Sequence, residues 1–154
     1  METDESAERI AQDLLEVSGD AILNDKYDCF RSCFSLPLTL QTVEGTRTVV
    51  TEQAFRDTFQ TVRQHMADTG VIDLVRTIVS SVYEDENTIG SIHICSDIYK
   101  EGSLYREPYP VFSRIHLSGG KWRIGLCRYH IHDLPAHNAA LIGTQSTLTK
   151  SSFS

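Results

Sequence analysis

Two adjacent glycines, Gly119 and Gly120, divide the most strand-like part of the chain into two halves. A Gly-Gly pair between alternating runs favours a two-residue β-hairpin loop, because glycine adopts the positive φ angles that such loops require. If these two residues form the whole loop, the register of residues 109–132 is fixed. The predicted opposite pairs are Leu117 with Trp122, Ile115 with Ile124, Val111 with Arg128, and Tyr109 with His130.

This register assigns the side chains of the hairpin to two faces of a sheet. The more apolar face is expected to pack on helices, and it becomes polar toward the end away from the loop. It comprises Tyr109, Val111, Ser113, Ile115, Leu117, Trp122, Ile124, Leu126, Arg128, His130 and His132. The opposite face comprises Phe112, Arg114, His116, Arg123, Cys127 and Tyr129. A shift of one residue would reverse the assignment.

Two more long strands are predicted upstream of the hairpin. Residues 71–83 are rich in β-branched side chains, and residues 88–99 alternate after a polar turn. Ile92, Ile94 and Ile98 are expected to face inward. Cys95 is on the opposite face with His93, Asp97 and Tyr99, and these last three are expected at a dimer interface or in solvent.

The first 70 residues have helical periodicity around a short strand pair. A helix is predicted over residues 6–17, and Ser18-Gly19-Asp20 is expected to interrupt it before a second helix that ends at Pro37. Residues 38–50 are predicted to form two strands around a turn at Glu44-Gly45. Thr51 is expected to cap a third helix, which Gly70 closes.

Composition limits the number of domains and the classes of function. Of 154 residues, 40% are hydrophobic and 23% are charged, so we expect a single domain over residues 1–133. Residues 134–154 are nearly uncharged and are expected to form a C-terminal tail, loose or packed over a neighbouring surface. The net charge of −7 argues against nucleic-acid binding, because phosphate neutralisation supplies most of that affinity. No apolar run approaches the roughly 20 residues of a membrane helix.

Compartment is predicted from the cysteines and the N-terminus. The four cysteines show no CxxC spacing and no disulfide-scaffold density, so we expect free thiols. The acidic N-terminus argues against a secretory signal. Both observations favour a cytoplasmic location.

Three stretches of the chain match a known arrangement of elements. Residues 25–34 (DKYDCFRSCF) look like an acidic-aromatic second helix followed by a hydrophobic pair. Residues 51–70 look like the third helix of the same arrangement, and residues 119–124 (GGKWRI) look like its last hairpin. With the element order, they resemble the NTF2-like superfamily, and within it the SnoaL-like group, over roughly residues 6–132.

The resemblance implies an α+β cone, in which three helices of the N-terminal half pack on a curved antiparallel sheet. The open end of such a cone usually forms a pocket, and similar proteins commonly form homodimers through the outer sheet face. Members include isomerases, dehydratases and ligand-binding modules, so the fold does not select a reaction. We predict a small apolar ligand and no cofactor. The protein is either an acid–base isomerase or dehydratase, or a non-catalytic ligand-binding or dimerisation module.

His130 and Asp73 are the candidate proton-transfer residues. His130 is placed on the predicted inner face beside Tyr109 and Arg128, and enzymes of this shape often use a histidine or a carboxylate inside the cone. Asp73 shares a face with Ile92, and so is expected to point inward, if the turn after Tyr83 has an even number of residues. Each residue also has a purely structural interpretation. His130 would be a hydrogen-bonded histidine at a sheet edge, and Asp73 would cap a turn at the start of a strand.

A larger set of residues is predicted to line the pocket. It comprises Tyr27, Phe30, Phe34, Phe55, Phe59, Tyr109, Trp122 and Arg128. Arg128 is expected either to bind an anionic ligand or to pair with a carboxylate. His130 and His132 have a spacing seen in metal sites, but spacing places no third ligand, so we predict no metal.

Overall fold

The computed structural model describes residues 6–99 and 108–130. Its helices are α1 (Ala7–Leu23), α2 (Tyr27–Ser32) and α3 (Glu52–Thr69). Its strands are β1 (Phe34–Thr42), β2 (Gly45–Val49), β3 (Val71–Asp85), β4 (Thr88–Tyr99), β5 (Tyr109–Ser118) and β6 (Lys121–Tyr129). No helix within these two ranges is long and apolar enough to cross a membrane.

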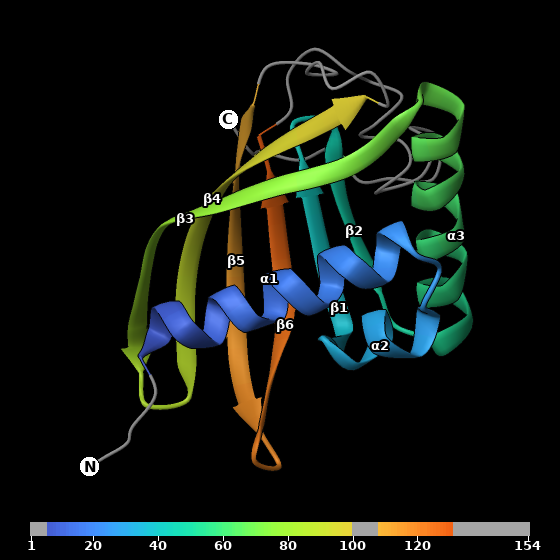
Figure 1. Cartoon of the computed structure of the whole chain (residues 1–154). Helices are drawn as coiled ribbons and strands as arrows, with labels where there is room; N and C mark the ends of the chain where they lie inside the picture. The colour runs from blue at the N-terminus through green and yellow to red at the C-terminus, as the bar shows by residue number, and fades with distance from the viewer. Residues whose placement is uncertain (1–5, 100–107, 131–154) are drawn as a thin grey trace.

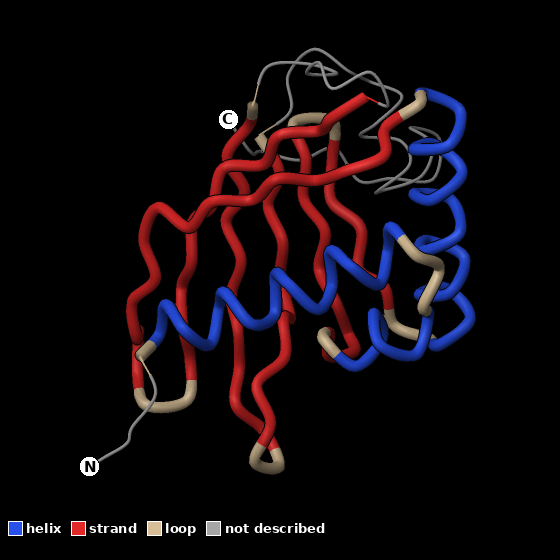
Figure 2. Tube along the Cα trace, viewed as in Figure 1, coloured by secondary structure: helices blue, strands red, loops and turns tan. Residues whose placement is uncertain are grey.

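The six strands form one curved sheet in the order β2-β1-β6-β5-β4-β3. The β1–β6 pair is parallel and the other neighbours are antiparallel. Helix α1 crosses one face of the sheet, while β3 and β4 bend over toward the end of α3 (Figure 1). Figure 2 shows the same arrangement with the helices in blue and the strands in red. The predicted α+β cone of three helices on a curved sheet is confirmed.

The third helix begins and ends where the sequence predicts. The Ala54 N–H donates to the Thr51 side-chain oxygen at 3.0 Å, which satisfies one of the free amides of the first turn. Gly70 has a φ angle of 80°, the left-handed conformation of a helix C-terminus. The pair of strands before this helix is also confirmed, as β1 and β2.

The predicted interruption of the first helix is wrong, because α1 continues through residues 18–20. The Ser18 hydroxyl donates back to the Leu15 carbonyl at 3.4 Å, within the helix. Gly19 lets α1 approach the sheet closely, since a Cβ there would lie 2.5 Å from an Arg76 guanidinium nitrogen. The Ser-Gly-Asp sequence therefore does not end the helix, and its glycine allows the helix to pack closely on the sheet. The second helix is correspondingly short, and Phe34 and Pro37 belong to β1.

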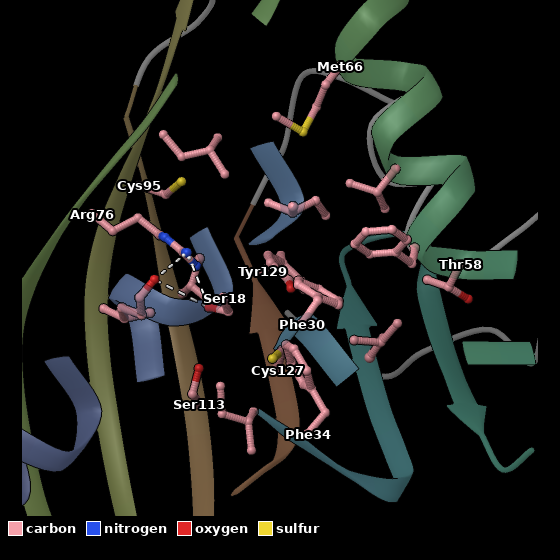
Figure 3. Close-up of a pocket in the computed structure, with 18 of the residues that line it drawn as sticks. Ser18, Phe30, Phe34, Thr58, Met66, Arg76, Cys95, Ser113, Cys127 and Tyr129 are labelled. Atoms are coloured by element: carbon pink, nitrogen blue, oxygen red, sulfur yellow. Dashed lines mark hydrogen bonds between the residues drawn. The ribbon is translucent and has the colours of Figure 1, made fainter. Parts of the chain in front are cut away.

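A β-bulge at Gly125 changes the register of the last hairpin. Ile115 pairs with Ile124 as predicted, but Arg114 pairs with Leu126, which leaves Gly125 as an extra residue in β6. Beyond the bulge, the faces of β6 are reversed. Cys127 and Tyr129 face the helices (Figure 3). Their predicted outward orientation is therefore wrong.

The inner face of β4 is also the opposite of the predicted one. His93 and Asp97 are only 4% and 2% exposed, whereas Ile92 is 40% exposed. The prediction placed the isoleucines inside because apolar faces usually pack on helices. In β4 it is the outer face that is the more apolar one. Polar groups on the inner face can be buried because they have hydrogen-bond partners inside the cone, as Asp97 has in Tyr109. Both faces of β4 are thus compatible with burial, so alternation could not identify the inner one.

Candidate functional site

The concave side of the sheet encloses a cavity of about 130 Å³ beneath α1, α2 and α3 (Figure 3). Four phenylalanines from α2, β1 and α3 line it, together with aliphatic side chains from the same elements and from the sheet. The aromatic members are Phe30, Phe34, Phe55 and Phe59. The cavity is therefore mainly apolar.

Phe30 lies at the centre of this aromatic group. Its ring centroid lies 4.8 Å from that of Phe34, 5.0 Å from that of Phe59 and 5.7 Å from that of Phe55. Such distances are typical of favourable tilted aromatic pairs. Phe55 and Phe59 are 2% and 1% exposed, so this wall of the cavity is firmly packed.

A buried carboxylate, Asp97, lies in the same lining. The Tyr109 hydroxyl donates to its Oδ1 at 3.2 Å, and the Cys95 thiol donates to the same oxygen at 3.6 Å. Burial raises the pKa of Cys95 to about 12, and the Asp97 charge adds to this effect. Burial also raises the pKa of Tyr109 well above its usual value. Both donors therefore keep their protons at neutral pH.

Arg76 enters the cavity from β3 and reaches α1 (Figure 3). Its Nη2 donates to the Leu15 carbonyl at 2.8 Å and to the Ser18 hydroxyl at 3.3 Å. Burial and, to a smaller extent, the Arg76 charge lower the pKa of His93 to about 3. Burial also lowers the pKa of His65, an effect that Asp97 partly opposes. Both histidines are thus uncharged at neutral pH, and Arg76 is the cation of the described lining.

Five of the predicted pocket residues lie in the cavity lining: Phe30, Phe34, Phe55, Phe59 and Tyr109. Tyr27 lies behind it, where its ring packs edge-on against Phe55 and Phe59 and its hydroxyl donates to Glu52 at 2.5 Å. Trp122 packs on Tyr83 at the other end of the sheet, with 6.1 Å between ring centroids.

The predicted inward orientation of Arg128 is wrong. The Gly125 bulge turns this side chain to the outer face, where its Nε donates to Gln41 at 2.8 Å. Its guanidinium carbon there lies 5.5 Å from the centre of the Phe112 ring. Arg128 therefore lies on the opposite side of the sheet from the cavity.

The two predicted proton-transfer residues are absent from the described cavity lining. His130 follows β6, and its backbone N–H donates to the Pro110 carbonyl at 3.1 Å. Asp73 shares a face with Ile92, as the two-residue turn predicts, but this is the outer face and Asp73 is exposed. Catalytic roles for His130 and Asp73 stay predictions. His132 and the predicted tail lie outside the described residues.

Sequence reasoning missed the charged residues and the histidines of the cavity, although it placed Tyr109 in the pocket. Arg76 had a usable signal, because a charged residue inside an apolar strand is rarely buried without a reason. Asp97 was assigned to the outer face with His93 and Cys95. Within residues 6–99 and 108–130, no group of three or more His, Cys, Asp or Glu side chains could hold a metal ion.

The sequence matches no protein-family model and no curated protein. Solved structures do match in shape. An NTF2-like protein of unknown function from Shewanella oneidensis superposes with a TM-score of 0.64 over 80% of this chain and 98% of its own, at 11% identity. This chain has the NTF2-like fold.

Two further NTF2-like or cystatin-like structures support this assignment. A domain of unknown function with a cystatin-like fold from Nostoc punctiforme has a TM-score of 0.65 at 13% identity, covering 86% of this chain and 82% of its own. An NTF2-like protein from Novosphingobium aromaticivorans has a TM-score of 0.60 at 10% identity, covering 88% of each chain. At such identities the likeness establishes the NTF2-like fold alone, and the SnoaL-like assignment stays a prediction.

Proposed function

We propose that the cone binds a small, largely apolar molecule with one ring, and that Asp97 holds or moves a proton on it. The observation that carries this proposal is a carboxylate, only 2% exposed, in a cavity whose walls are mostly aromatic and aliphatic. Burying a carboxylate is costly, so a carboxylate kept in an apolar cavity is a candidate for a functional group.

The dimensions of the cavity support a ligand with a single ring. Its volume of about 130 Å³ is close to the roughly 150 Å³ of apolar protein cavities that bind benzene. Phe30 and its aromatic neighbours offer a surface on which a flat ring can pack.

The proposed chemistry is proton transfer next to a carbonyl group of the ligand. The Asp97 carboxylate takes the α-proton, and the electron pair of the C–H bond moves onto the carbonyl oxygen. Tyr109, which keeps its own proton, is the neighbouring hydrogen-bond donor for the oxygen that becomes negative. In a β,γ-unsaturated ketone, return of the proton from Asp97 to the γ-carbon shifts the double bond and gives isomerisation. In a β-hydroxy ketone, the same proton goes to the β-hydroxyl group, which leaves as water as the C=C bond forms, and this gives dehydration.

Cyclohexanone in D₂O tests both parts of this proposal. NMR reports its binding and the exchange of its α-protons, and general-base catalysis contributes typically 10²–10⁴-fold. We expect exchange to be faster with the wild-type protein, to fall at least about 100-fold in Asp97→Asn, and to be unchanged in the exposed control Asp13→Asn. Binding without faster exchange would refute the proton-transfer step and favour the non-catalytic module.

A homodimer through the outer sheet face is a second part of the proposal. Four aliphatic side chains of β3 and β4 are 40% to 60% exposed on this face: Val75, Val79, Val82 and Ile92. Several exposed apolar side chains on one face of a sheet are typical of an interface. We expect Val79→Lys to be monomeric by sedimentation velocity, whereas Val17→Lys, on α1, stays dimeric. A monomeric wild-type protein would refute the dimer. A cytoplasmic location stays a prediction.

A further inference from the structure

Arg76 is a cation in an apolar cavity whose charge has no carboxylate partner among the described residues. The ion pairs there are Arg9–Asp13, Lys26–Asp20, Arg31–Glu52, Arg63–Asp25 and Arg114–Glu84. Each of these pairs has at least one side chain that is 37% or more exposed. Arg76 is half-buried, and an anion stabilises a guanidinium that is partly removed from water, because its desolvation is costly.

The position of the Arg76 head is fixed by uncharged partners. Its hydrogen bonds to the Leu15 carbonyl and the Ser18 hydroxyl both come from one nitrogen, Nη2. A guanidinium has five N–H donors in a rigid fork, so these two contacts orient it and use only part of its capacity. Gly19 provides the space, since any Cβ at that position would collide with Nη2.

On the cavity side, the β4 residues beside Arg76 add no charge at neutral pH, whereas Glu16, Asp20 and Asp73 line a separate pocket that Arg76 also borders. His93 is uncharged, because its pKa is about 3 in this buried position next to Arg76. Cys95, the residue opposite Arg76 in the β3–β4 ladder, keeps its proton. Asp97 is two residues further along β4, a step of about 7 Å. Arg76 and Asp97 thus occupy different positions in the β3–β4 ladder, where Asp97 is opposite Leu74, and no ion pair joins them.

We propose that the ligand of the cone is a small ring carboxylate, with its carboxylate on Arg76 and its ring on the phenylalanine cluster. This inference rests on the proposed ligand-binding function and specifies its ligand class. A planar guanidinium matches a carboxylate in a two-pronged arrangement, and the pairing is strongest where water is excluded. Arg76 and the rings of Phe30 and its aromatic neighbours line the same cavity, so one ligand can contact both.

Three probes of similar shape test the inference on the full chain: benzoate, benzamide and toluene. Isothermal titration calorimetry at pH 7 should show that benzoate binds the wild-type protein at least about tenfold more tightly than benzamide. In Arg76→Gln, which keeps an amide donor for α1, this preference should disappear while toluene still binds. The matched control is Arg63→Gln, because Arg63 also donates to an α1 carbonyl, that of Ile22, but lies outside the cavity lining.

The outcomes separate this inference from the proposed function. If toluene binds and benzoate has no advantage over benzamide in the wild-type protein, the ring-carboxylate inference is refuted and the apolar cavity stands. If none of the three probes binds, both are refuted. Should Arg76→Gln fail to fold, Gly19→Ala replaces it, because the added methyl group displaces the guanidinium. Loss of the benzoate preference in Gly19→Ala supports the inference, and a retained preference overturns it.

Discussion

His93 should make the free energy of unfolding depend on pH between about pH 6.5 and 5. A protein without a buried histidine changes little in this range. The pKa of His93 is about 3 in the folded state because of burial and Arg76, against 6.5 for an ordinary histidine. Between these values the unfolded chain binds a proton that the folded protein does not. Stability contributed by neutral His93 is therefore complete above pH 6.5 and is lost as the pH falls below it.

The magnitude follows from the difference in protonation. Each pH unit below 6.5 costs about 1.4 kcal/mol, so at pH 5 the wild-type protein should lose about 2 kcal/mol through His93 alone. His93→Gln has no ionisable group at this position and should lack this loss. Contributions from His65 and from the surface carboxylates are present in both proteins, so they cancel in the difference.

Urea unfolding of both proteins at pH 7.5, 6 and 5 measures this difference. We expect the free energy of unfolding of the wild-type protein to fall by about 2 kcal/mol relative to His93→Gln between pH 7.5 and 5. Parallel pH profiles of the two proteins would mean that His93 is hydrated, as the alternation of β4 alone predicts, and would refute the buried assignment.

Two further changes test the packing around the cavity and the start of α3. Phe59→Ala removes a ring that is 1% exposed, so it should lower the free energy of unfolding by about 3–5 kcal/mol, measured in urea; a loss below about 1 kcal/mol would mean that the aromatic wall is loosely packed. Thr51→Ala removes the acceptor for the Ala54 N–H and should cost about 1 kcal/mol in the same assay, whereas Thr51→Ser should restore most of it. Equal stabilities of the two Thr51 variants would contradict the capping role.

The fold was predictable because its local signals agree with one another. The Thr51 cap, the Gly70 terminus and the Gly119-Gly120 loop each depend on a few neighbouring residues. The first pairs of the hairpin, up to Ile115 with Ile124, follow directly from the loop. Element order then sufficed to indicate the cone.

The site was only partly predictable, because the inner face depends on single-residue shifts. One extra residue at Gly125 moves Arg128 to the outer face and Tyr129 into the cavity. An isolated glycine in a strand is a known sign of a bulge, and it offered a signal that the hairpin register did not use. For β4, no local signal places Asp97 inside, because its inward position depends on hydrogen bonds from Tyr109 and Cys95.

The phenylalanines were predictable for a different reason. Residues at helical spacing, such as Phe55 and Phe59, face the core whatever the register of the sheet. They line the cavity because the core of a cone and the wall of its pocket are the same surface. The phenylalanines of the site could therefore be predicted from periodicity, whereas Arg76, His93 and Asp97 required the three-dimensional structure.

The central claim, that the cone takes a one-ring ligand, is tested most directly by an NMR titration of methyl-labelled protein with toluene. We expect saturable shifts at Leu38 and Val62, whose methyl groups line the cavity, and none at Val79 or Val82 on the outer face. The absence of saturable shifts, or shifts confined to the outer-face valines, would contradict the account.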